Sequence, residues 1–141
     1  SFMIDEPIME HPADNGTMVI NRKGKPSQTS CEVLEGFGRY SWAKFQIFTG
    51  RTHQIRVHMK FAGHPIVCDP LYGDGQPFFL SSVKRNFRLS KFQEEERPLI
   101  NRLALHSSSL QFRDDNGKEY LLEAPLPKDL KAGLQQLRKL K

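Results

Sequence analysis

Polar side chains suited to chemistry gather in one short run, GRTHQIRVHM, between positions 50 and 59. The spacing predicts a helix over residues 51–63, bracketed by two glycines, with this run around the helix start. Free N–H groups and the helix dipole attract anions there. Arg51 and Thr52 could therefore hold a phosphate, and Arg56, one turn later, could meet a carboxylate or a second phosphate. The alternative is a capped helix with ordinary surface arginines, which spacing alone favours.

The apolar face of the predicted helix indicates where Arg56 points. At about 100° per residue, Ile55, Met59 and Ala62 fall on one stripe. A second apolar patch indicates that the helix is mostly buried between other elements. Arg56 lies at the margin of the stripe, which predicts a semi-buried guanidinium that faces inward.

Other kinds of catalytic site find little support in the sequence. His53 and His58 are not at the i, i+4 spacing of a zinc-binding pair, and no HExxH motif occurs, so we expect no metal site. The sequence also lacks the GxSxG, P-loop and GxGxxG motifs of serine hydrolases, NTPases and dinucleotide-binding enzymes. Cys31 and Cys68 stand in apolar surroundings, where a small buried side chain is more common than a nucleophile.

A basic and aromatic segment is a second candidate site. Residues 77–102 are irregular and mixed in charge, and we interpret them as a surface insertion or long loop. Cations with interleaved aromatic residues can grip RNA through phosphate contacts and stacking. A solvated loop is the more common outcome for such a run. The candidate RNA-binding side chains of this segment are Lys84, Arg85 and Arg88.

Length and composition limit the classes of protein to which the chain can belong. It has 141 residues, 38% of them hydrophobic, which is enough for the core of one domain. No apolar run approaches the roughly 20 residues of a membrane-spanning helix, and two cysteines are too few for a disulfide framework. No signal peptide is visible, so we expect a cytoplasmic globular domain. The net charge of +5 permits nucleic-acid binding without proving it.

Hairpin signals dominate the predicted secondary structure. Two pairs of β-prone runs each flank a turn, one turn carrying two glycines and the other the sequence Asn-Gly. An amphipathic helix is predicted over residues 128–140, and residues 5–16 are predicted to be extended or looped. Because hairpins make antiparallel sheets, we predict an α+β fold with one antiparallel sheet and flanking helices. The predicted strands are residues 28–34, 40–48, 103–112 and 119–123.

Several segments together resemble a known family. The run GRTHQIRVHM is followed by GHPIVCDPLYG at residues 63–73. Further segments are LALHS at residues 103–107, LEAPLP at 122–127 and GKPSQT at 24–29. In this order, and over nearly the whole chain, the sequence resembles the RluA/RluD-type RNA pseudouridine synthases. The central motif is long and specific, so chance agreement is not expected.

The resemblance implies an isomerase that converts uridine in RNA to pseudouridine. The family cleaves the N-glycosidic bond, rotates the base and rejoins it through carbon, without a metal or cofactor. Its active site has an Asp in an R-L-D motif, a Tyr that stacks on the base, an Arg that pairs with the Asp, and an aliphatic residue beneath the ring. Carried over to this sequence, the Arg is Arg56 and the aliphatic residue is Ile66. Large-subunit ribosomal RNA, the commoner substrate, is the expected partner.

One part of the family pattern is missing. The sequence contains no R-L-D, and Asp69 belongs to the D-P-L-Y-G turn, where a structural role is the stronger interpretation. We therefore expect residues 1–141 to be the C-terminal part of a synthase catalytic domain, inactive alone, with the catalytic Asp and Tyr upstream. Arg56 would orient and ionise a carboxylate rather than act as a nucleophile or base. Truncation of a shared sheet exposes strand edges, so a dimer through that surface is a further prediction.

Alternatives stay open for single residues and for the whole chain. Arg51 and His53 either contact RNA phosphate or satisfy backbone carbonyl groups. The chain could be a non-catalytic RNA-binding module derived from the synthase fold, or a free-standing protein that uses this fold for protein contacts. An R-L-D Asp and a K-x-Y Tyr encoded just upstream would favour the enzyme.

Overall fold

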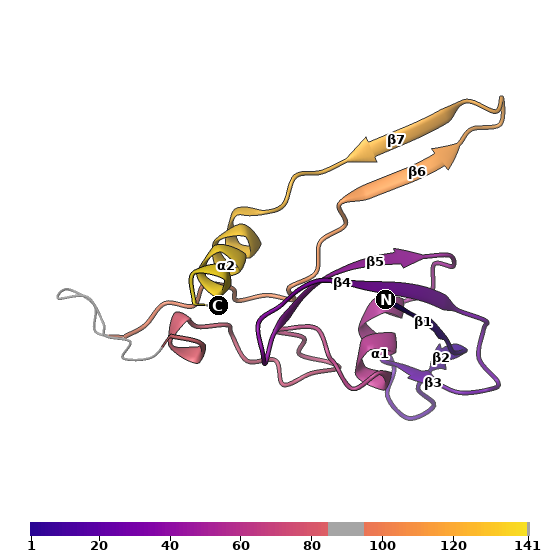
Figure 1. Cartoon of the computed structure of the whole chain (residues 1–141). Coiled ribbons are helices and arrows are strands. Elements are labelled where there is room, and N and C mark those ends of the chain that lie inside the picture. Colours follow the sequence, from indigo (N-terminus) through magenta and orange to yellow (C-terminus); the bar gives the residue numbers. More distant parts are fainter. Residues whose placement is uncertain (85–94, 141) are drawn as a thin grey trace.

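A computed structural model describes residues 1–84 and 95–140 of the chain (Figure 1). It has the predicted α+β architecture, and the strand pairings in these residues are antiparallel. No helix in this part of the chain is long and apolar enough to cross a membrane. The elements are, in order, β1 (Phe2–Asp5), β2 (Ile8–Glu10), β3 (Met18–Ile20), β4 (Gln28–Gly36), β5 (Ser41–Ile47), α1 (Gln54–Phe61), the 3-10 turn η1 (Leu80–Ser82), β6 (Ser109–Arg113), β7 (Glu119–Glu123) and α2 (Lys128–Lys139).

The sheet with the strand order β1-β4-β5 supports helix α1 (Figure 1). The predicted helical stripe is confirmed, because Ile55, Met59 and Ala62 pack into one cluster with the sheet. Ile4 of β1 and Cys31 of β4 are the buried members on the sheet side. Burial of these apolar side chains stabilises the helix on the sheet, since removing apolar surface from water is favourable.

Residues 5–16, predicted to be extended or looped, are both in turn, because β2 lies within that range and residues 11–16 belong to no strand. β2 pairs with β3, with Ile8 opposite Ile20. Ile8 is only 3% exposed and packs with Val57 and Tyr72, so its burial outweighs the local turn signals. The neighbouring prolines lie outside this short strand, where they remove no hydrogen bond from the ladder.

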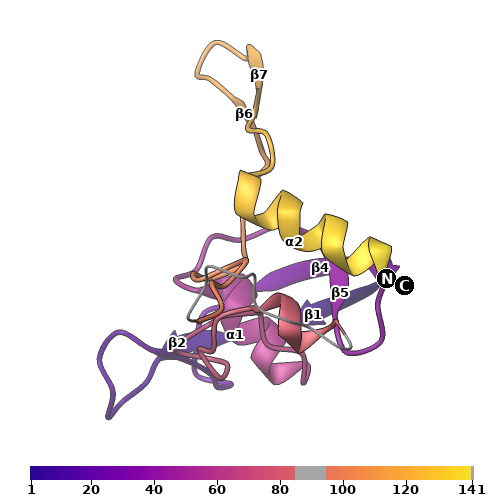
Figure 2. The same ribbon diagram turned by 90° about the vertical axis from the view of Figure 1, so that its left-hand side faces the viewer.

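The prediction of one sheet that unites both hairpins is also wrong. Among the described strands, β6 and β7 pair only with each other, and their hairpin extends away from the rest of the molecule (Figure 1 and Figure 2). Residues 103–108, predicted as strand, are not part of one, and the Ala104 N–H donates to the Val67 carbonyl at 3.0 Å. Alternation and the Asn-Gly turn determine the pairing within a hairpin, but not the sheet edge that it joins.

A second core lies where α2 packs on the chain that follows α1. Phe78 and Ile100 form a β-bridge there and pack against Leu130 of α2. Residues 77–102, predicted to be a surface insertion or long loop, therefore begin and end near the core. Residues 85–94 of this segment are outside the described part of the chain.

Candidate active site

The start of α1 differs from the prediction. The helix begins at Gln54 rather than at position 51, because His53 has left-handed backbone angles (φ 54°, ψ 27°). Such angles are uncommon for residues other than glycine and cluster at functional sites. The Gln54 Oε1 atom accepts hydrogen bonds from the Arg51 N–H at 3.0 Å and the Thr49 hydroxyl at 2.8 Å, which organises the turn before the helix. Gly63, predicted to follow the helix, has the left-handed φ of 84° that this position favours.

Buried hydrogen bonds attach α1 to β4. Gln54 Nε2 donates to the Thr29 hydroxyl at 2.9 Å, and this hydroxyl lies 2.8 Å from His58 Nδ1. His58 Nε2 faces the Glu6 carbonyl at 2.9 Å. Because a carbonyl can only accept, Nε2 is the donor to Glu6, and in the neutral form of the ring Nδ1 accepts from the Thr29 hydroxyl. His58 is fully buried and is therefore a hydrogen-bonded core histidine.

The centre of the site is an ion pair between α1 and the turn that follows it. Arg56 donates from Nε to Asp69 Oδ2 at 2.9 Å and from Nη2 to Asp69 Oδ1 at 2.8 Å. The Asp69 side chain is fully buried, and that of Arg56 is 15% exposed, which confirms the semi-buried position predicted for Arg56. This two-point contact is the geometry that planar guanidinium groups form with carboxylates.

The surroundings of Asp69 keep its carboxylate ionised. Burial alone would raise the pKa of Asp69. Hydrogen bonds from Arg56 and from the backbone N–H groups of Tyr72 and Leu71 together outweigh burial and hold the pKa below its ordinary value. The hydrogen bonds to Asp69 likewise raise the pKa of Arg56. The two groups therefore form a charged pair at neutral pH.

Tyr72 holds the same arginine from another side. Its ring centroid lies 5.2 Å from the Arg56 guanidinium carbon, a cation–π distance. Its hydroxyl accepts the Met18 N–H at 2.8 Å and lies 2.8 Å from His53 Nδ1. Burial, followed by the nearby charge of Arg56, lowers the pKa of His53, although Asp69 partly opposes this shift. A neutral His53 can accept a hydrogen bond from the Tyr72 hydroxyl at Nδ1, so this tyrosine joins β3 to the start of α1.

The other candidate residues have varied surroundings. The Arg51 guanidinium donates to the Pro26 carbonyl from Nε at 3.1 Å and from Nη2 at 2.9 Å. Thr52 and Lys84 are exposed. Ile66 is partly buried and packs against the cluster under α1. Arg85 and Arg88 lie outside the described residues.

Asp69 and Tyr72 belong to the site but were not assigned to Arg56 from the sequence. The structural role favoured for Asp69 agrees with its hydrogen bonds from the backbone of its own turn. Its contact with Arg56 was missed, because thirteen residues and a change of direction separate the two. The available signal was the DPLYG segment, which follows the arginine run and carries both a carboxylate and an aromatic ring.

The cysteines have the surroundings of core residues, as predicted. Cys31 and Cys68 are 2% and 6% exposed. Burial raises the pKa of both thiols, which disfavours the nucleophilic thiolate. Within the described ranges, no group of His, Cys, Asp and Glu side chains has the arrangement of a metal site.

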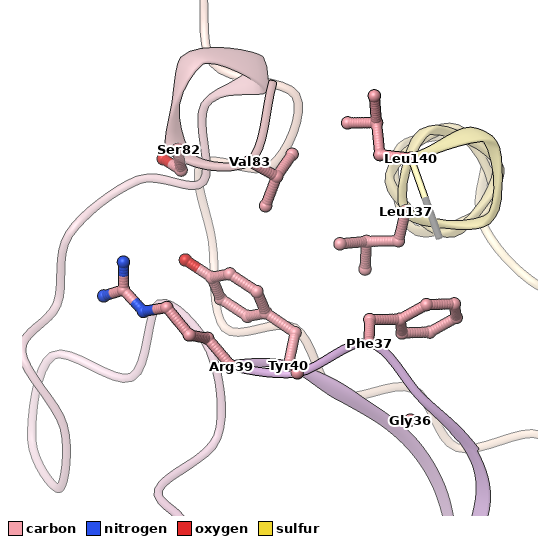
Figure 3. A pocket seen from close by; sticks show the side chains of 9 residues that line it. Gly36, Phe37, Arg39, Tyr40, Ser82, Val83, Leu137 and Leu140 are labelled. Carbon is pink, nitrogen blue, oxygen red and sulfur yellow. The ribbon is translucent and has the colours of Figure 1, made fainter. Parts of the chain in front are cut away.

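A pocket of about 300 Å³ lies at the end of the β4–β5 hairpin, beside η1 and α2 (Figure 3). Tyr40, Val83 and Leu137 point toward it, and Arg39 lies at one side. The residues that line it include no carboxylate and no histidine, the side chains that most often act as bases at neutral pH. The ion pair at Arg56 is the better candidate for the active site.

Comparisons with known proteins point to one family. A family model described as RNA pseudouridylate synthase matches residues 3–61. The ribosomal large subunit pseudouridine synthase D of Nitrosomonas europaea is 37% identical over 141 aligned residues, covering 98% of this chain and 37% of that protein. Its namesake in Escherichia coli K12 is 36% identical over 138 residues, covering 96% of this chain and 40% of that protein. The chain thus spans about two fifths of the length of these relatives.

Two solved human structures have a similar fold. Human RNA Pseudouridylate Synthase Domain Containing 4 has a TM-score of 0.64 at 26% identity, covering 97% of this chain and 56% of that one. Human RNA Pseudouridylate Synthase Domain Containing 1 has a TM-score of 0.61 at 27% identity, covering 97% of this chain and 59% of that one. By the motif around Arg56, by its relatives and by its fold, the chain belongs to the RluA/RluD-type RNA pseudouridine synthase family.

Proposed function

We propose that this chain is the C-terminal part of the catalytic domain of an RNA pseudouridine synthase that isomerises uridine in large-subunit ribosomal RNA. The names of the two bacterial relatives supply the class of RNA. The observation that carries the proposal is the position of the Arg56 guanidinium. It belongs to the family motif, lies semi-buried on α1, and has N–H groups that Asp69 does not use and that can bind another carboxylate. The proposed reaction uses no metal or cofactor, and its proposed location is the cytoplasm.

The nucleophilic Asp and the stacking Tyr belong, in this proposal, to a segment upstream of the chain. Asp69 is the carboxylate beside Arg56, but it is fully buried. Its Oδ1 accepts hydrogen bonds from Arg56, Leu71 and Tyr72, and its Oδ2 accepts one from Arg56. A carboxylate with these lone pairs engaged, and with no access to solvent, is a poor nucleophile for a nucleotide. Its surroundings therefore support a nucleophile from outside this chain.

Arg56 and Ile66 have separate roles in the proposed site. Arg56 donates hydrogen bonds to the incoming catalytic Asp, which keeps that carboxylate ionised and oriented. Ile66 lies beneath the ring of the base, at a position fixed by its packing against the cluster under α1. Their common support by α1 explains why both roles depend on the same short segment of sequence.

The proposed RNA contacts come from exposed cations and polar groups. Thr52 and Lys84 are exposed and can reach phosphates, and Arg85 and Arg88 are assigned with them from the sequence. Arg51 and His53 have intramolecular partners, the Pro26 carbonyl and the Tyr72 hydroxyl. These contacts support the structural alternative for both residues.

A non-catalytic RNA-binding module is the second candidate. The absence of R-L-D from the sequence, together with the buried state of Asp69, favours it for the chain taken alone. For the isolated chain we also propose the dimer through the truncated surface, and we propose that this surface includes the apolar face of the β6–β7 hairpin, where Leu110 and Leu122 are more than half exposed (58% and 55%). Covering these side chains with a second copy would remove apolar surface from water.

Conversion of uridine in a ribosomal RNA transcript, read by chemical labelling of pseudouridine, tests the proposal. Residues 1–141 alone should give no product above background, and the parent reading frame, including the residues upstream of Ser1, should give product. Turnover by the isolated chain would mean that one of its own aspartates is the nucleophile. An inactive parent that still binds RNA would favour the non-catalytic module.

A further inference from the structure

We infer that Asp69 is a positioning residue of the synthase: it fixes one edge of the Arg56 guanidinium so that the opposite edge faces the catalytic carboxylate. This inference rests on the proposed function and deepens it. Besides the catalytic carboxylate, which is proposed to lie upstream, the reaction would then depend on a carboxylate of this chain that does not touch the substrate.

The donor pattern of Arg56 is the first step. A guanidinium has five N–H groups in a planar fork. Asp69 takes one from Nε and one from Nη2. No side chain or carbonyl of the described residues accepts a hydrogen bond from Nη1, so Nη1 and the second N–H of Nη2 form a free edge. That edge can make a second two-point contact, which is the contact a catalytic carboxylate needs.

The rigidity of Asp69 is the second step. Its Oδ1 accepts the backbone N–H groups of Leu71 at 3.0 Å and Tyr72 at 3.1 Å, and its side chain is fully buried. The backbone of its own turn therefore fixes the carboxylate independently of its contact with Arg56. Tyr72, whose ring centroid is 5.2 Å from the guanidinium carbon, restricts the arginine further.

The charge balance is the third step. Asp69 neutralises Arg56, so the free edge acts on the catalytic carboxylate mainly through directed hydrogen bonds rather than through an uncompensated positive charge. Directed hydrogen bonds depend on geometry, and a misplacement of about 1 Å can cost on the order of a hundredfold in rate. A purely structural role for Asp69 would predict no such dependence.

Asp69→Asn in the full parent protein tests the inference. The asparagine carbonyl can still accept from Leu71 and Tyr72, but the charge and one acceptor for Arg56 are lost. We expect kcat to fall about tenfold to a hundredfold, with KM for RNA changing less than about twofold. Asp129→Asn is the matched control, because Asp129 makes the same two-point contact with Arg102 in an exposed pair, and kcat should not change.

A second measurement separates positioning from folding. If Asp69 acts through Arg56, adding Asp69→Asn to Arg56→Ala should lower kcat no further, whereas independent roles would multiply the losses. Asp69→Asn with kcat intact and only a lower melting temperature would overturn the inference while leaving the proposed function in place. Failure of the wild-type parent to form pseudouridine would instead overturn the proposed function, and this inference with it.

Discussion

The α1 region and the β6–β7 hairpin differ in how their side chains are surrounded: α1 covers a hydrogen-bonded polar network, whereas the hairpin exposes apolar side chains. Across the described residues, no buried side-chain nitrogen or oxygen lacks a hydrogen-bond partner, and the network of Gln54, Thr29 and His58 under α1 is one example. In the hairpin, Leu110 and Leu122 face each other across the strands and remain 58% and 55% exposed. The first region satisfies its buried polar groups within its own chain, whereas the second presents an apolar surface that nothing in the described chain covers.

The hairpin nevertheless has the pattern of a sheet with one buried face. Leu110 and Phe112 alternate with polar residues along β6, and their partners on β7 are Leu122 and Tyr120. Phe112 and Tyr120 stack with ring centroids 5.0 Å apart. A lone two-stranded hairpin is marginally stable in water, and one apolar face is typical of a sheet packed against something else. The difference between the regions is therefore the availability of a partner and not the quality of the local pattern.

Removal of the Asp69 carboxylate should cause the largest change in the free energy of unfolding, because this carboxylate is a buried, hydrogen-bonded group of the α1 region. Asp69→Ala leaves Arg56 semi-buried and unpaired, and removal of one member of a buried pair costs about 3–5 kcal/mol in the free energy of unfolding. Urea denaturation of the chain measures this loss. Asp129→Ala removes the partner of Arg102 in an exposed pair and should cost about 1 kcal/mol or less. Equal losses for the two variants would mean that burial gives the Asp69 pair no special role.

Arg56→Ala should cause the next largest effect, on turnover by the parent protein. If Arg56 donates to the catalytic carboxylate as proposed, loss of these hydrogen bonds should lower kcat by about two to three orders of magnitude, while RNA affinity stays largely intact. Single-turnover conversion of a ribosomal RNA transcript and a filter-binding assay measure the two quantities.

Two further variants sharpen the Arg56 experiment. Arg56→Lys should also fail, because an ammonium cannot make the planar two-point contacts of a guanidinium. Arg88→Ala should change RNA affinity or its salt dependence and spare the chemical step. If Arg56→Ala weakened binding and left single-turnover chemistry unchanged, Arg56 would be a phosphate ligand and the assignment would be wrong.

Sequence reasoning succeeded where neighbouring residues decide the structure. The stripe of α1, the C-terminal glycine of that helix, the pairing of both hairpins and helix α2 all follow from local spacing. Such reasoning left the structure open where distant contacts decide, as at Ile8, whose burial selects a paired strand in a segment predicted only to be extended or looped. The Arg56–Asp69 contact was not predicted for the same reason, since no local pattern links a helix face to a later turn. The partner predicted for Arg56 was the catalytic Asp of an R-L-D motif, and the contact with Asp69 is an additional one that needed the structure.

A charge on the apolar face of the hairpin should have a smaller effect on folding than either change at the ion pair. Leu110→Lys places a cation where the side chain is already 58% exposed, so the free energy of unfolding should change by about 0.5 kcal/mol or less. The same change should convert the proposed dimer of the isolated chain into monomers, as measured by sedimentation velocity. Gln111→Lys is the control, because Gln111 points to the opposite face of β6 and should leave the dimer intact. A dimer that survives Leu110→Lys would require a different interface.

The smallest expected effect is a dependence of stability on pH that arises from His53. Burial lowers the pKa of this histidine from 6.5 in the folded chain, so the unfolded state binds more protons over the range between the two values. The contribution of His53 to the free energy of unfolding should therefore be fully present above about pH 6.5. It should be lost as the pH drops through the lowered pKa. Urea denaturation between about pH 7.5 and 5.5 measures this slope.

His53→Asn provides the comparison, because asparagine tolerates the left-handed backbone at position 53 and does not titrate in this range. The variant should lose part of the slope that the wild-type chain shows, while His11→Asn, at a partly exposed site near β2, should retain it. A slope unchanged by His53→Asn would show that His53 does not sense its contact with Tyr72 and the nearby charge of Arg56. Other groups would then cause the pH dependence of stability. The contact between Tyr72 and His53 would hold the helix start in place without changing the protonation of His53.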